Sequence, residues 1–415
     1  MSAGPVSVCG TPRHTRTKSD VCLVSDEHQW WPGTVVGKAR RTIMVATSDS
    51  SMTQCHISAM DATTTNPVFC TIVPPHVFDR LIEAEDPALA RIARRTFVAD
   101  AAQRTERRLT TVLGAEPAVP PAGAAADQPQ RTVYDARHST TLPGRKVRGE
   151  GEAPVQDATV NRAYAGLGAT FELYLQAYRR HSIDGSGMPL DATVHFDNSY
   201  NNAFWNGTQM VFGDGDGQIF LDFTLPVDVI GHELTHGVTQ HSANLTYFGQ
   251  PGALNESMSD VFGSLVKQYA LDQDADRADW LIGAGLLAPG VHGDALRSMK
   301  APGTAYDDAV LGKDPQPATM DQYVTTGRDN GGVHINSGIP NHAFYLVADA
   351  LGGKAWERAG QIWYDVLTGG RLGSQATFKD FAGLTVAAAR DRYGLDGAET
   401  QAVLKAWAQV GVPAA

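Results

Sequence analysis

The chain changes its pattern near Val227, and this change limits the folds open to it. Residues 131–226 carry short β-type runs separated by Asn, Asp and Gly turns, at 192–196, 209–212 and 218–223. From Val227 onward the apolar residues recur at helical spacing, over 227–241, 255–270, 336–352, 354–368, 376–392 and 396–410. We therefore expect an α+β fold with a β-rich lobe at 131–226, a helical lobe at 227–415 and a cleft between them.

A Pro/Ala-rich run at residues 117–130 (PAVPPAGAAADQPQ) divides the chain and is typical of a linker. Before it, residues 77–112 follow Pro74-Pro75 as one charged amphipathic helical pattern, with apolar positions at Leu81, Ile82, Leu89, Ile92 and Phe97. That segment is too small to hold a core of its own, so we expect it to pack on the larger domain. Residues 1–66 show no convincing periodicity and stay unassigned, with disorder as one interpretation.

Charge and cysteine content exclude several classes of protein. The net charge of −11 falls entirely on residues 131–415, so the main domain lacks the basic face of a nucleic-acid-binding protein. All four cysteines precede residue 71, at Cys9, Cys22, Cys55 and Cys70. The main domain therefore has no disulfide and no cysteine nucleophile, and a metal bound by its own side chains must sit on His, Asp or Glu.

The N-terminus lacks the continuous apolar core of a secretory signal, because charged residues interrupt it at Arg13, Arg16, Lys18, Asp20, Asp26 and Glu27. No stretch of the sequence is apolar and long enough to span a bilayer, so we expect no membrane partner. We expect a secreted monomer that is exported without a recognisable signal peptide, with a cytoplasmic location as the alternative. A later start at Met52 or Met60 stays open.

The residues His232-Glu-Leu-Thr-His236 form an H-E-x-x-H motif within a helical segment. Positions four apart share one face of a helix, so both imidazoles can bind a single zinc ion at about 2.0–2.1 Å. Glu233 lies one step round the helix and can reach a water on that ion without binding the ion itself. The motif alone does not decide, since a surface helix with two solvated histidines has the same pattern.

A third ligand is available at the start of the next helical segment. Glu256 lies twenty residues after His236, and Asp260 shares its helix face four residues later. A carboxylate at Asp260 can orient a ligand histidine by accepting a hydrogen bond from its other ring nitrogen. The alternative is that both acids only complement the helix N-terminus, a contribution of about 0.3–1 kcal/mol each. The combination of all these residues favours a metal site.

A second polar cluster runs from Asp329 to Gly338 (DNGGVHINSG). Its two glycines predict a tight turn, across which Asp329 can reach back to orient His334. Local pattern leaves a catalytic and a structural role for His334 equally open.

At this point the sequence resembles the thermolysin-like zinc metallopeptidases. The matching stretches occur in the family's order within residues 131–415, at Asn201–Gly207, Met210–Gly217, His232–Gly237, Asn255–Gly263, Leu296–Met299 and Gly331–Gly338. The resemblance implies the zincin (thermolysin-like) fold, in which the H-E-x-x-H helix bridges a β-rich and a helical lobe. It also implies a zinc-dependent endopeptidase that acts on peptide and protein substrates.

The resemblance assigns roles residue by residue. The ligands of a single zinc ion are His232, His236 and Glu256, and Asp260 orients the first histidine. The catalytic groups are Glu233 as general base, His334 and Tyr247 as stabilisers of the oxyanion, and Asp329 as the partner of His334. The groups that hold the substrate backbone are Asn202, Ala203 and Arg297.

An apolar wall is expected beside the cut bond, and it favours a bulky hydrophobic residue directly after that bond. Its members are Phe220, Phe223, Val229, Ile282, Leu286 and Leu296. For each of them taken singly, a place in the ordinary core is a strong alternative.

Larger relatives bind two calcium ions in a carboxylate cluster near this site. Asp228 and Asp279 match two members of that cluster, whereas Lys267, Leu281 and Ala284 fall where further acidic ligands belong. A lysine ammonium there can replace the cation, so we predict that the double calcium site is absent.

The stretch Ile72–Phe78 (IVPPHVF) resembles the short propeptide of the protealysin-like subgroup. It implies an inhibitory propeptide at residues 67–116 and a self-processing zymogen that is cut within the linker, 117–130. Cys70 can reach the zinc as a thiolate in the latent form, although an incidental cysteine is the favoured interpretation.

Two other classes stay open beside the endopeptidase. A catalytically silent binding module is disfavoured by the presence of Glu233, His334 and Arg297 together. A zinc aminopeptidase needs extra acidic residues beside the metal to hold a free amino group, and no such motif is visible.

Overall fold

The computed structural model describes residues 70–112 and 127–414. The unassigned segment 1–66 and residues 117–126 of the linker lie outside the described residues. The chain divides into a unit at Met1–Thr64, wholly outside the described residues, and a unit at Thr65–Ala415, whose fold follows. Among the described helices, none has both the length and the apolar character that crossing a membrane requires.

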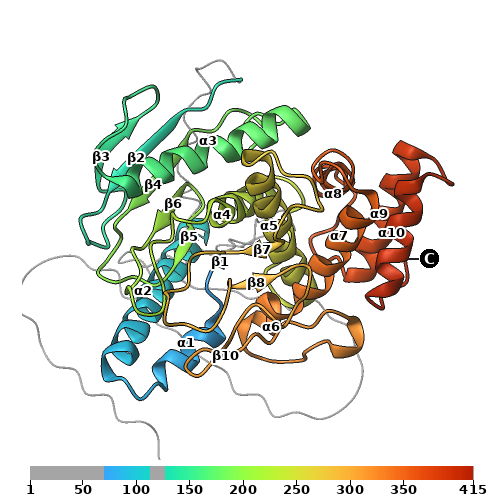
Figure 1. Cartoon of the computed structure of the whole chain (residues 1–415). Coiled ribbons are helices and arrows are strands. Elements are labelled where there is room, and N and C mark those ends of the chain that lie inside the picture. Colours follow the sequence, from blue (N-terminus) through green and yellow to red (C-terminus); the bar gives the residue numbers. More distant parts are fainter. Residues whose placement is uncertain (1–69, 113–126, 415) are drawn as a thin grey trace, which may run out of the picture. The chain divides into compact units, whose positions relative to one another are not determined.

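A six-stranded mixed sheet forms the core of the β-rich lobe (Figure 1). Its strands lie in the order β1 (Cys70–Thr71), β5 (Ala203–Trp205), β6 (Gln209–Phe212), β4 (Leu190–Val194), β2 (Arg131–Asp135) and β3 (Arg145–Gly149). β4 runs parallel to β2 and β6, and the other pairs are antiparallel. Because β1 precedes the linker, the segment before the linker and the main domain share one sheet.

The strand predictions are confirmed only in part. The runs at 192–196 and 209–212 overlap β4 and β6, whereas residues 218–223 form no strand and only a single bridge, Phe220 to Leu287. The physical reason is that Asp216 Oδ1 accepts hydrogen bonds from the backbone N–H groups of residues 218, 219 and 220, which makes a turn there. The sequence patterns of β2, β3 and β5 were too short or too charged to predict strands.

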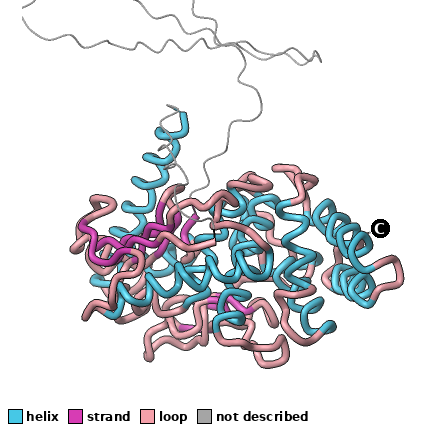
Figure 2. The backbone as a smooth tube through the Cα atoms, turned by 90° about the horizontal axis from the view of Figure 1, so that it is seen from above, coloured by secondary structure: helices cyan, strands magenta, loops and turns pink. Residues whose placement is uncertain are grey.

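Helices dominate the rest of the fold (Figure 2). Asp157 caps α3 (Ala158–Tyr178), since its side chain accepts hydrogen bonds from the N–H groups of Thr159 and Val160. The others are α4 (Val227–Gln240), α5 (Gly249–Ala270), α6 (Asp329–Asn336), α7 (Gly338–Leu351), α8 (Ala359–Thr368), α9 (Phe378–Tyr393) and α10 (Ala398–Gln409), with a short 3-10 helix at Met320–Gln322. Two further strand pairs are β7 (Leu281–Ile282) with β8 (Arg297–Ser298), and β9 (Asp307–Asp308) with β10 (Gly312–Lys313). The expected α+β architecture, with a strand-bearing lobe followed by a helical lobe, is confirmed.

Several helix boundaries differ from the expectation; α8, for example, begins at Ala359 and not at 354. The single helix expected over residues 77–112 is two helices, α1 (Pro75–Ile82) and α2 (Pro87–Val112). Pro87 explains the break, because a proline cannot continue a helix but is well suited to begin one. α5 begins six residues before the expected position 255, since Gly249 and Pro251 both lie in its first turn, where proline costs no hydrogen bond.

The segment before the linker packs on the larger domain, as expected. Val77, Phe78 and Leu81 of α1 are buried in the main hydrophobic cluster. On α2, Asp100 accepts hydrogen bonds from the Tyr200 hydroxyl and, at 3.1 Å, from Asn202 Nδ2. Phe97, one of the predicted apolar positions, is instead about half exposed.

His195 gives the fold a measurable dependence on pH. Its ring nitrogens lie 2.8 Å from Asp214 Oδ1 and 2.9 Å from Asp157 Oδ2, and these two carboxylates raise the pKa of His195 to about 9 although burial opposes the shift. A raised folded-state pKa means that the stabilisation is complete below about pH 6.5 and is lost as pH rises through 9. We expect the free energy of unfolding to fall by up to about 3 kcal/mol across that window relative to His195→Gln, measured by urea unfolding at several pH values.

Candidate metal centre

Helix α4 carries the two histidines and the glutamate of the H-E-x-x-H motif in a fully buried position. The side chains of His232, Glu233 and His236 are at most 2% exposed, so the alternative of two solvated surface histidines is wrong. The two Nε2 atoms lie 3.0 Å apart and face each other. The i, i+4 spacing therefore brings the two imidazoles to one point, as expected.

Glu256 reaches the same point from α5. Its carboxylate oxygens lie 3.5 Å from His232 Nε2 and 3.6 Å from His236 Nε2. Ligands about 2.0–2.1 Å from a tetrahedral zinc ion are separated from one another by about 3.3–3.4 Å. The three observed separations bracket that value, so the residues fit a zinc ion.

The Nδ1 atoms of His232 and His236 each lie within hydrogen-bond distance of an oxygen atom that can accept a hydrogen bond. His232 Nδ1 lies 2.8 Å from Asp260 Oδ1, as predicted. His236 Nδ1 lies 2.8 Å from Asn255 Oδ1 and 3.0 Å from Ser259 Oγ, two partners that the sequence analysis missed. The sequence did contain a pattern that could have predicted them, because Asn255 and Ser259 are four residues apart on either side of Glu256 and therefore share one face of α5.

These contacts leave the two Nε2 lone pairs directed at each other. Burial, followed by the nearby His232, lowers the pKa of His236 to about 3, so its imidazole is neutral. Glu256 is a carboxylate: burial alone raises its pKa, but His334, His236 and His232 hold it below its ordinary value. Two ring nitrogens 3.0 Å apart beside a buried carboxylate form a set of donor atoms that fits a bound cation.

Glu233 lies beside this point and does not join the three ligands. Its Oε2 accepts a hydrogen bond from the Trp205 backbone N–H at 3.0 Å, and its buried Oε1 has no hydrogen-bond partner among the described residues. Burial, followed by the negative charge of Glu256, raises the pKa of Glu233 well above its ordinary value. The backbone contact from β5, which sequence reasoning did not foresee, fixes the orientation of the carboxylate.

His334 and Tyr247 line the opposite side of the site. Asp329 Oδ1 lies 2.6 Å from His334 Nδ1, across a turn in which Gly331 and Gly332 adopt positive φ. Burial opposes the protonation of His334, but Glu256 and Asp329 raise its pKa to about 9, so the ring is a cation at neutral pH. Tyr247 donates a hydrogen bond to Glu256 and lies 3.2 Å from His334 Nε2. The predicted tight turn and the Asp329–His334 contact are thus present.

The three residues expected to hold a substrate backbone all contact residues 72 and 73. The Ile72 N–H donates to the Ala203 carbonyl at 3.2 Å, and the Ile72 carbonyl accepts from Arg297 Nη1 at 3.0 Å. The Val73 N–H donates to Asn202 Oδ1 at 3.0 Å. Arg297 is itself fixed by two hydrogen bonds of 2.8 Å to Asp260, which joins the backbone clamp to the metal centre.

The six residues expected to form an apolar wall are buried in one hydrophobic cluster together with Ile72. They are Phe220, Phe223, Val229, Ile282, Leu286 and Leu296. Phe220 and Phe223 pack ring to ring, with centroids 5.7 Å apart. Since the same cluster forms most of the core, burial alone does not separate a pocket from ordinary packing.

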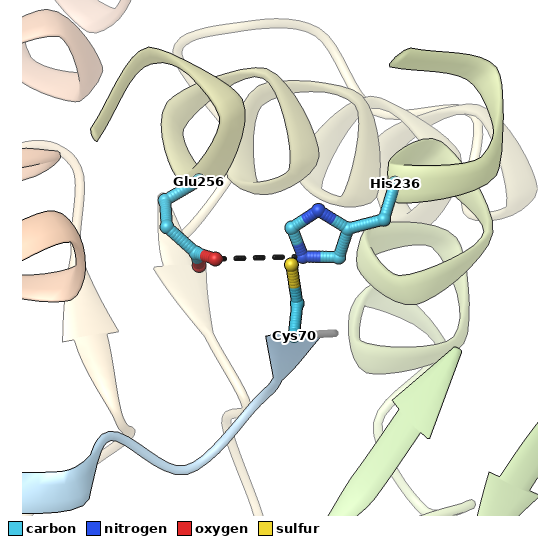
Figure 3. A group of neighbouring side chains, drawn as sticks. All are labelled: Cys70, His236 and Glu256. Atoms are coloured by element: carbon cyan, nitrogen blue, oxygen red, sulfur yellow. Dashed lines mark ion pairs between the residues drawn. The ribbon is translucent and has the colours of Figure 1, made fainter. Parts of the chain in front are cut away.

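Cys70 enters the centre from the edge strand β1. Its sulfur and a ligand atom each of His236 and Glu256 all lie within 4.8 Å of one another (Figure 3). Burial and the charge of Glu256 raise the pKa of the thiol well above its ordinary value. A thiolate is therefore unfavourable at this position unless a cation is present.

Two histidines and a carboxylate around one point, with a further unpaired carboxylate beside them, define the site of a zinc hydrolase. Comparison with known proteins gives the same class. Residues 124–240 match the catalytic domain of the thermolysin metallopeptidases, and residues 243–412 match their alpha-helical domain. The chain belongs to the thermolysin family of zinc metalloendopeptidases, within the protealysin-like group.

Individual relatives cover most of the chain. It is 48% identical over 344 residues to an extracellular metalloprotease of Pectobacterium carotovorum subsp. carotovorum, covering 83% of this chain and 96% of the relative. It is 52% identical to the protease PrtS of a Photorhabdus species, over 69% of this chain and 77% of that protein. The solved precursor of protealysin from Serratia proteamaculans matches with a TM-score of 0.75 and 52% identity, over 83% of this chain and 99% of that structure.

Proposed function

We propose that the described chain is the latent form of this endopeptidase, with residues 67–116 as an inhibitory propeptide whose residues 70–73 lie in the substrate position. One observation carries the proposal: β1 adds to the sheet as a strand antiparallel to β5, with Cys70 opposite Trp205 and Thr71 opposite Phe204. Strand addition to a sheet edge is a common way of binding an extended peptide. The strand ends directly beside the proposed metal ligands.

The peptide bond between Thr71 and Ile72 takes the place of the bond to be cut. The Thr71 carbonyl lies 3.2 Å from His334 Nε2, the group proposed to stabilise an oxyanion. The Ile72 N–H and carbonyl are held by Ala203 and Arg297. A substrate in this register would have its carbonyl facing His334 and Tyr247 and its next residue in the Arg297 clamp.

The proposed roles follow from this register. When bound by His232, His236 and Glu256, zinc supplies a Lewis acid that lowers the pKa of its water toward about 7. With the metal bound, the Oε1 atom of Glu233, which has no hydrogen-bond partner among the described residues, would take a proton from the attacking water and later give it to the leaving nitrogen. His334 and Tyr247 donate hydrogen bonds to the oxyanion, Asp329 holds the His334 ring, and Asn202, Ala203 and Arg297 position the backbone.

The position of Ile72 supports a preference for a bulky hydrophobic residue directly after the cut bond. Its side chain is completely buried in the cluster that contains the six predicted wall residues. We expect blocked peptides with Phe or Leu at that position to be cut with a kcat/KM about 100-fold or more above the Asp peptide, because burying an unpaired carboxylate costs several kcal/mol. Mass spectrometry of the products locates the cut.

The same peptides separate the competing functions. A chelator should abolish the cleavage, and restored zinc should recover it. Cleavage only of peptides with a free amino terminus would identify an aminopeptidase instead. If a zinc-loaded chain with a cut linker cleaves no peptide, the protein would instead be the catalytically silent binding module.

Self-processing within the linker, 117–130, remains part of the proposal. Residues 117–126 lie outside the described residues, whereas 127–130 lead into β2. The name of the Serratia structure describes that protein as a precursor, which supports the zymogen. The name "extracellular metalloprotease" of the Pectobacterium relative supports secretion over the cytoplasmic alternative. We retain the proposal of a monomer.

We also propose that Lys267 replaces the double calcium site. Its ammonium lies 2.7 Å from Asp228 Oδ2 and 2.8 Å from Asp279 Oδ1, and donates to the Leu281 carbonyl at 2.7 Å. Burial alone lowers the pKa of Lys267, but the two aspartates raise it, so the cation stays charged.

The Lys267 proposal predicts stability that does not depend on calcium. Neither added calcium nor a calcium chelator should move the urea unfolding midpoint of the wild-type chain. Lys267→Met should lose about 3–5 kcal/mol of unfolding free energy, because it leaves the buried carboxylate of Asp228 without its cationic partner. A calcium-dependent midpoint in the wild type would contradict the proposal.

A further inference from the structure

The inhibitory strand β1 brings the sulfur of Cys70 close to the proposed zinc ligands, at the position that the attacking water would need. Cys70 is 2% exposed, and Figure 3 shows its side chain directed from β1 toward the imidazole of His236 and the carboxylate of Glu256. The three ligand atoms lie within 4.8 Å of one another. His232 joins the trio through its Nε2, which is 3.0 Å from His236 Nε2 and 3.5 Å from Glu256 Oε2.

A second observation shows that this group of side chains is arranged for a ligand. Glu256 is completely buried, and its Oε2 has no hydrogen-bond partner among the described residues. Two ring nitrogens, His232 Nε2 and His334 Nε2, each lie 3.5 Å from this oxygen, which is longer than an ordinary hydrogen bond, so the oxygen is available for direct contact with a bound cation. The Glu256 carboxylate and the sulfur of Cys70 thus lie around the same point.

The backbone contacts of the inhibitory strand do not explain why its own Thr71–Ile72 bond stays uncut, whereas a role for the Cys70 sulfur does. The Thr71–Ile72 peptide bond lies in the cleavable position, with its carbonyl 3.2 Å from His334 Nε2 and its next residue held by Arg297. Backbone contacts of this kind bind a substrate as well as an inhibitor. What keeps the bond intact must therefore act on the attacking water.

We propose that the Cys70 thiolate is the fourth zinc ligand in the uncleaved chain, where it displaces the water that Glu233 activates. On coordination the S–H bond gives its proton to solvent, a zinc–sulfur bond forms and one water leaves. Two histidines, a carboxylate and a thiolate complete the tetrahedral, closed coordination typical of structural zinc sites. This inference rests on the proposed function, since it assigns a latency device to the same site.

Coordination by Cys70 makes the release of β1 the activating event. Within the described part of the chain, β1 comprises Cys70 and Thr71 and pairs with β5. Once the linker is cut, the strand can leave the sheet edge and take its sulfur with it, which opens the fourth position to water. Latency then depends on one thiol as well as on the backbone contacts of residues 72 and 73.

Cobalt substitution tests the ligand directly. The experiment uses the full chain with Cys9, Cys22 and Cys55 changed to Ser, so that Cys70 is the only thiol, and with Glu233→Gln to prevent self-cleavage. Cobalt replaces zinc in this chain and in its partner that also carries Cys70→Ser. We expect equal cobalt stoichiometry in the two chains, but the near-ultraviolet thiolate-to-cobalt charge-transfer band only where Cys70 is present.

The outcomes separate the two proposals. One bound cobalt without a charge-transfer band in the Cys70 chain would overturn the thiolate ligand and leave the endopeptidase site intact. Failure of both chains to bind cobalt would instead overturn the metal site. Loss of cobalt from only the Cys70→Ser chain would support the inference as a loss of ligand affinity.

Thiol reactivity gives an independent readout. In the same single-thiol chain, we expect the rate of reaction of Cys70 with an aromatic disulfide reagent to rise at least about tenfold when zinc is removed by a chelator, because a metal-bound thiolate is shielded. A thiol that is merely buried would react equally slowly with and without zinc. Equal rates, with circular dichroism showing the chain still folded, would contradict the proposal.

Discussion

Replacing Glu233 by glutamine should lower kcat/KM for a blocked peptide by about 10²- to 10⁴-fold, because the amide cannot accept the proton of the attacking water. Zinc should remain bound, since its proposed ligands are His232, His236 and Glu256, and Glu233 is not one of them. The glutamine oxygen can keep the hydrogen bond from the Trp205 N–H, so the fold should be unchanged. The chain should also persist uncleaved, which mass spectrometry of an aged sample measures.

The matched control is Glu357→Gln, which removes an exposed carboxylate far from the site in sequence. Activity is compared after the linker of each chain has been cut in trans by the wild-type enzyme. Full activity of Glu233→Gln would show that another group is the base. Loss of zinc from this variant would show that the glutamate takes part in binding the metal.

The second large effect is expected at Asp260. Its carboxylate accepts hydrogen bonds from His232, from Arg297 twice and from Asn341, all at 2.8 Å. Burial alone raises the pKa of Asp260, but Arg297 and His232 hold it well below its ordinary value, so the group is charged. Asp260→Asn leaves the buried guanidinium of Arg297 without the carboxylate that forms its ion pair.

We expect Asp260→Asn to lose about 3–5 kcal/mol of unfolding free energy and about 10- to 100-fold in zinc affinity. Urea unfolding and competition with a zinc indicator measure the two effects separately. The exposed Asp307→Asn is the control and should change neither quantity. Unchanged stability of Asp260→Asn would contradict the view that this carboxylate holds the metal centre and the backbone clamp together.

The sequence predicted the parts of the fold that depend on regular spacing. The helices of residues 227–415 carry a 3.6-residue apolar period, and their existence, although not every boundary, followed from it. The strands β2, β3 and β5 were missed, because each is at most five residues long and Arg131–Asp135 and Arg145–Gly149 are rich in charge. What makes them strands is their position in the sheet, which a local window does not contain.

The same limit applies to the site. The convergence of His232 and His236 is a property of one helix, so spacing alone predicted it. The contact of the Trp205 N–H with Glu233 joins two elements that are packed together only in three dimensions. Cys70 shows most clearly what the sequence alone does not reveal. The sequence favoured an incidental cysteine, whereas the pairing of β1 with β5 brings the Cys70 sulfur close to His236 and Glu256.

Anomalous diffraction at the zinc absorption edge, from crystals of the full chain, tests the central claim most directly. We predict one zinc ion per chain, at about 2.0–2.2 Å from Nε2 of His232, from Nε2 of His236 and from the Glu256 carboxylate. An anomalous peak elsewhere, or no peak in zinc-loaded crystals in which these three side chains are ordered, would contradict the account.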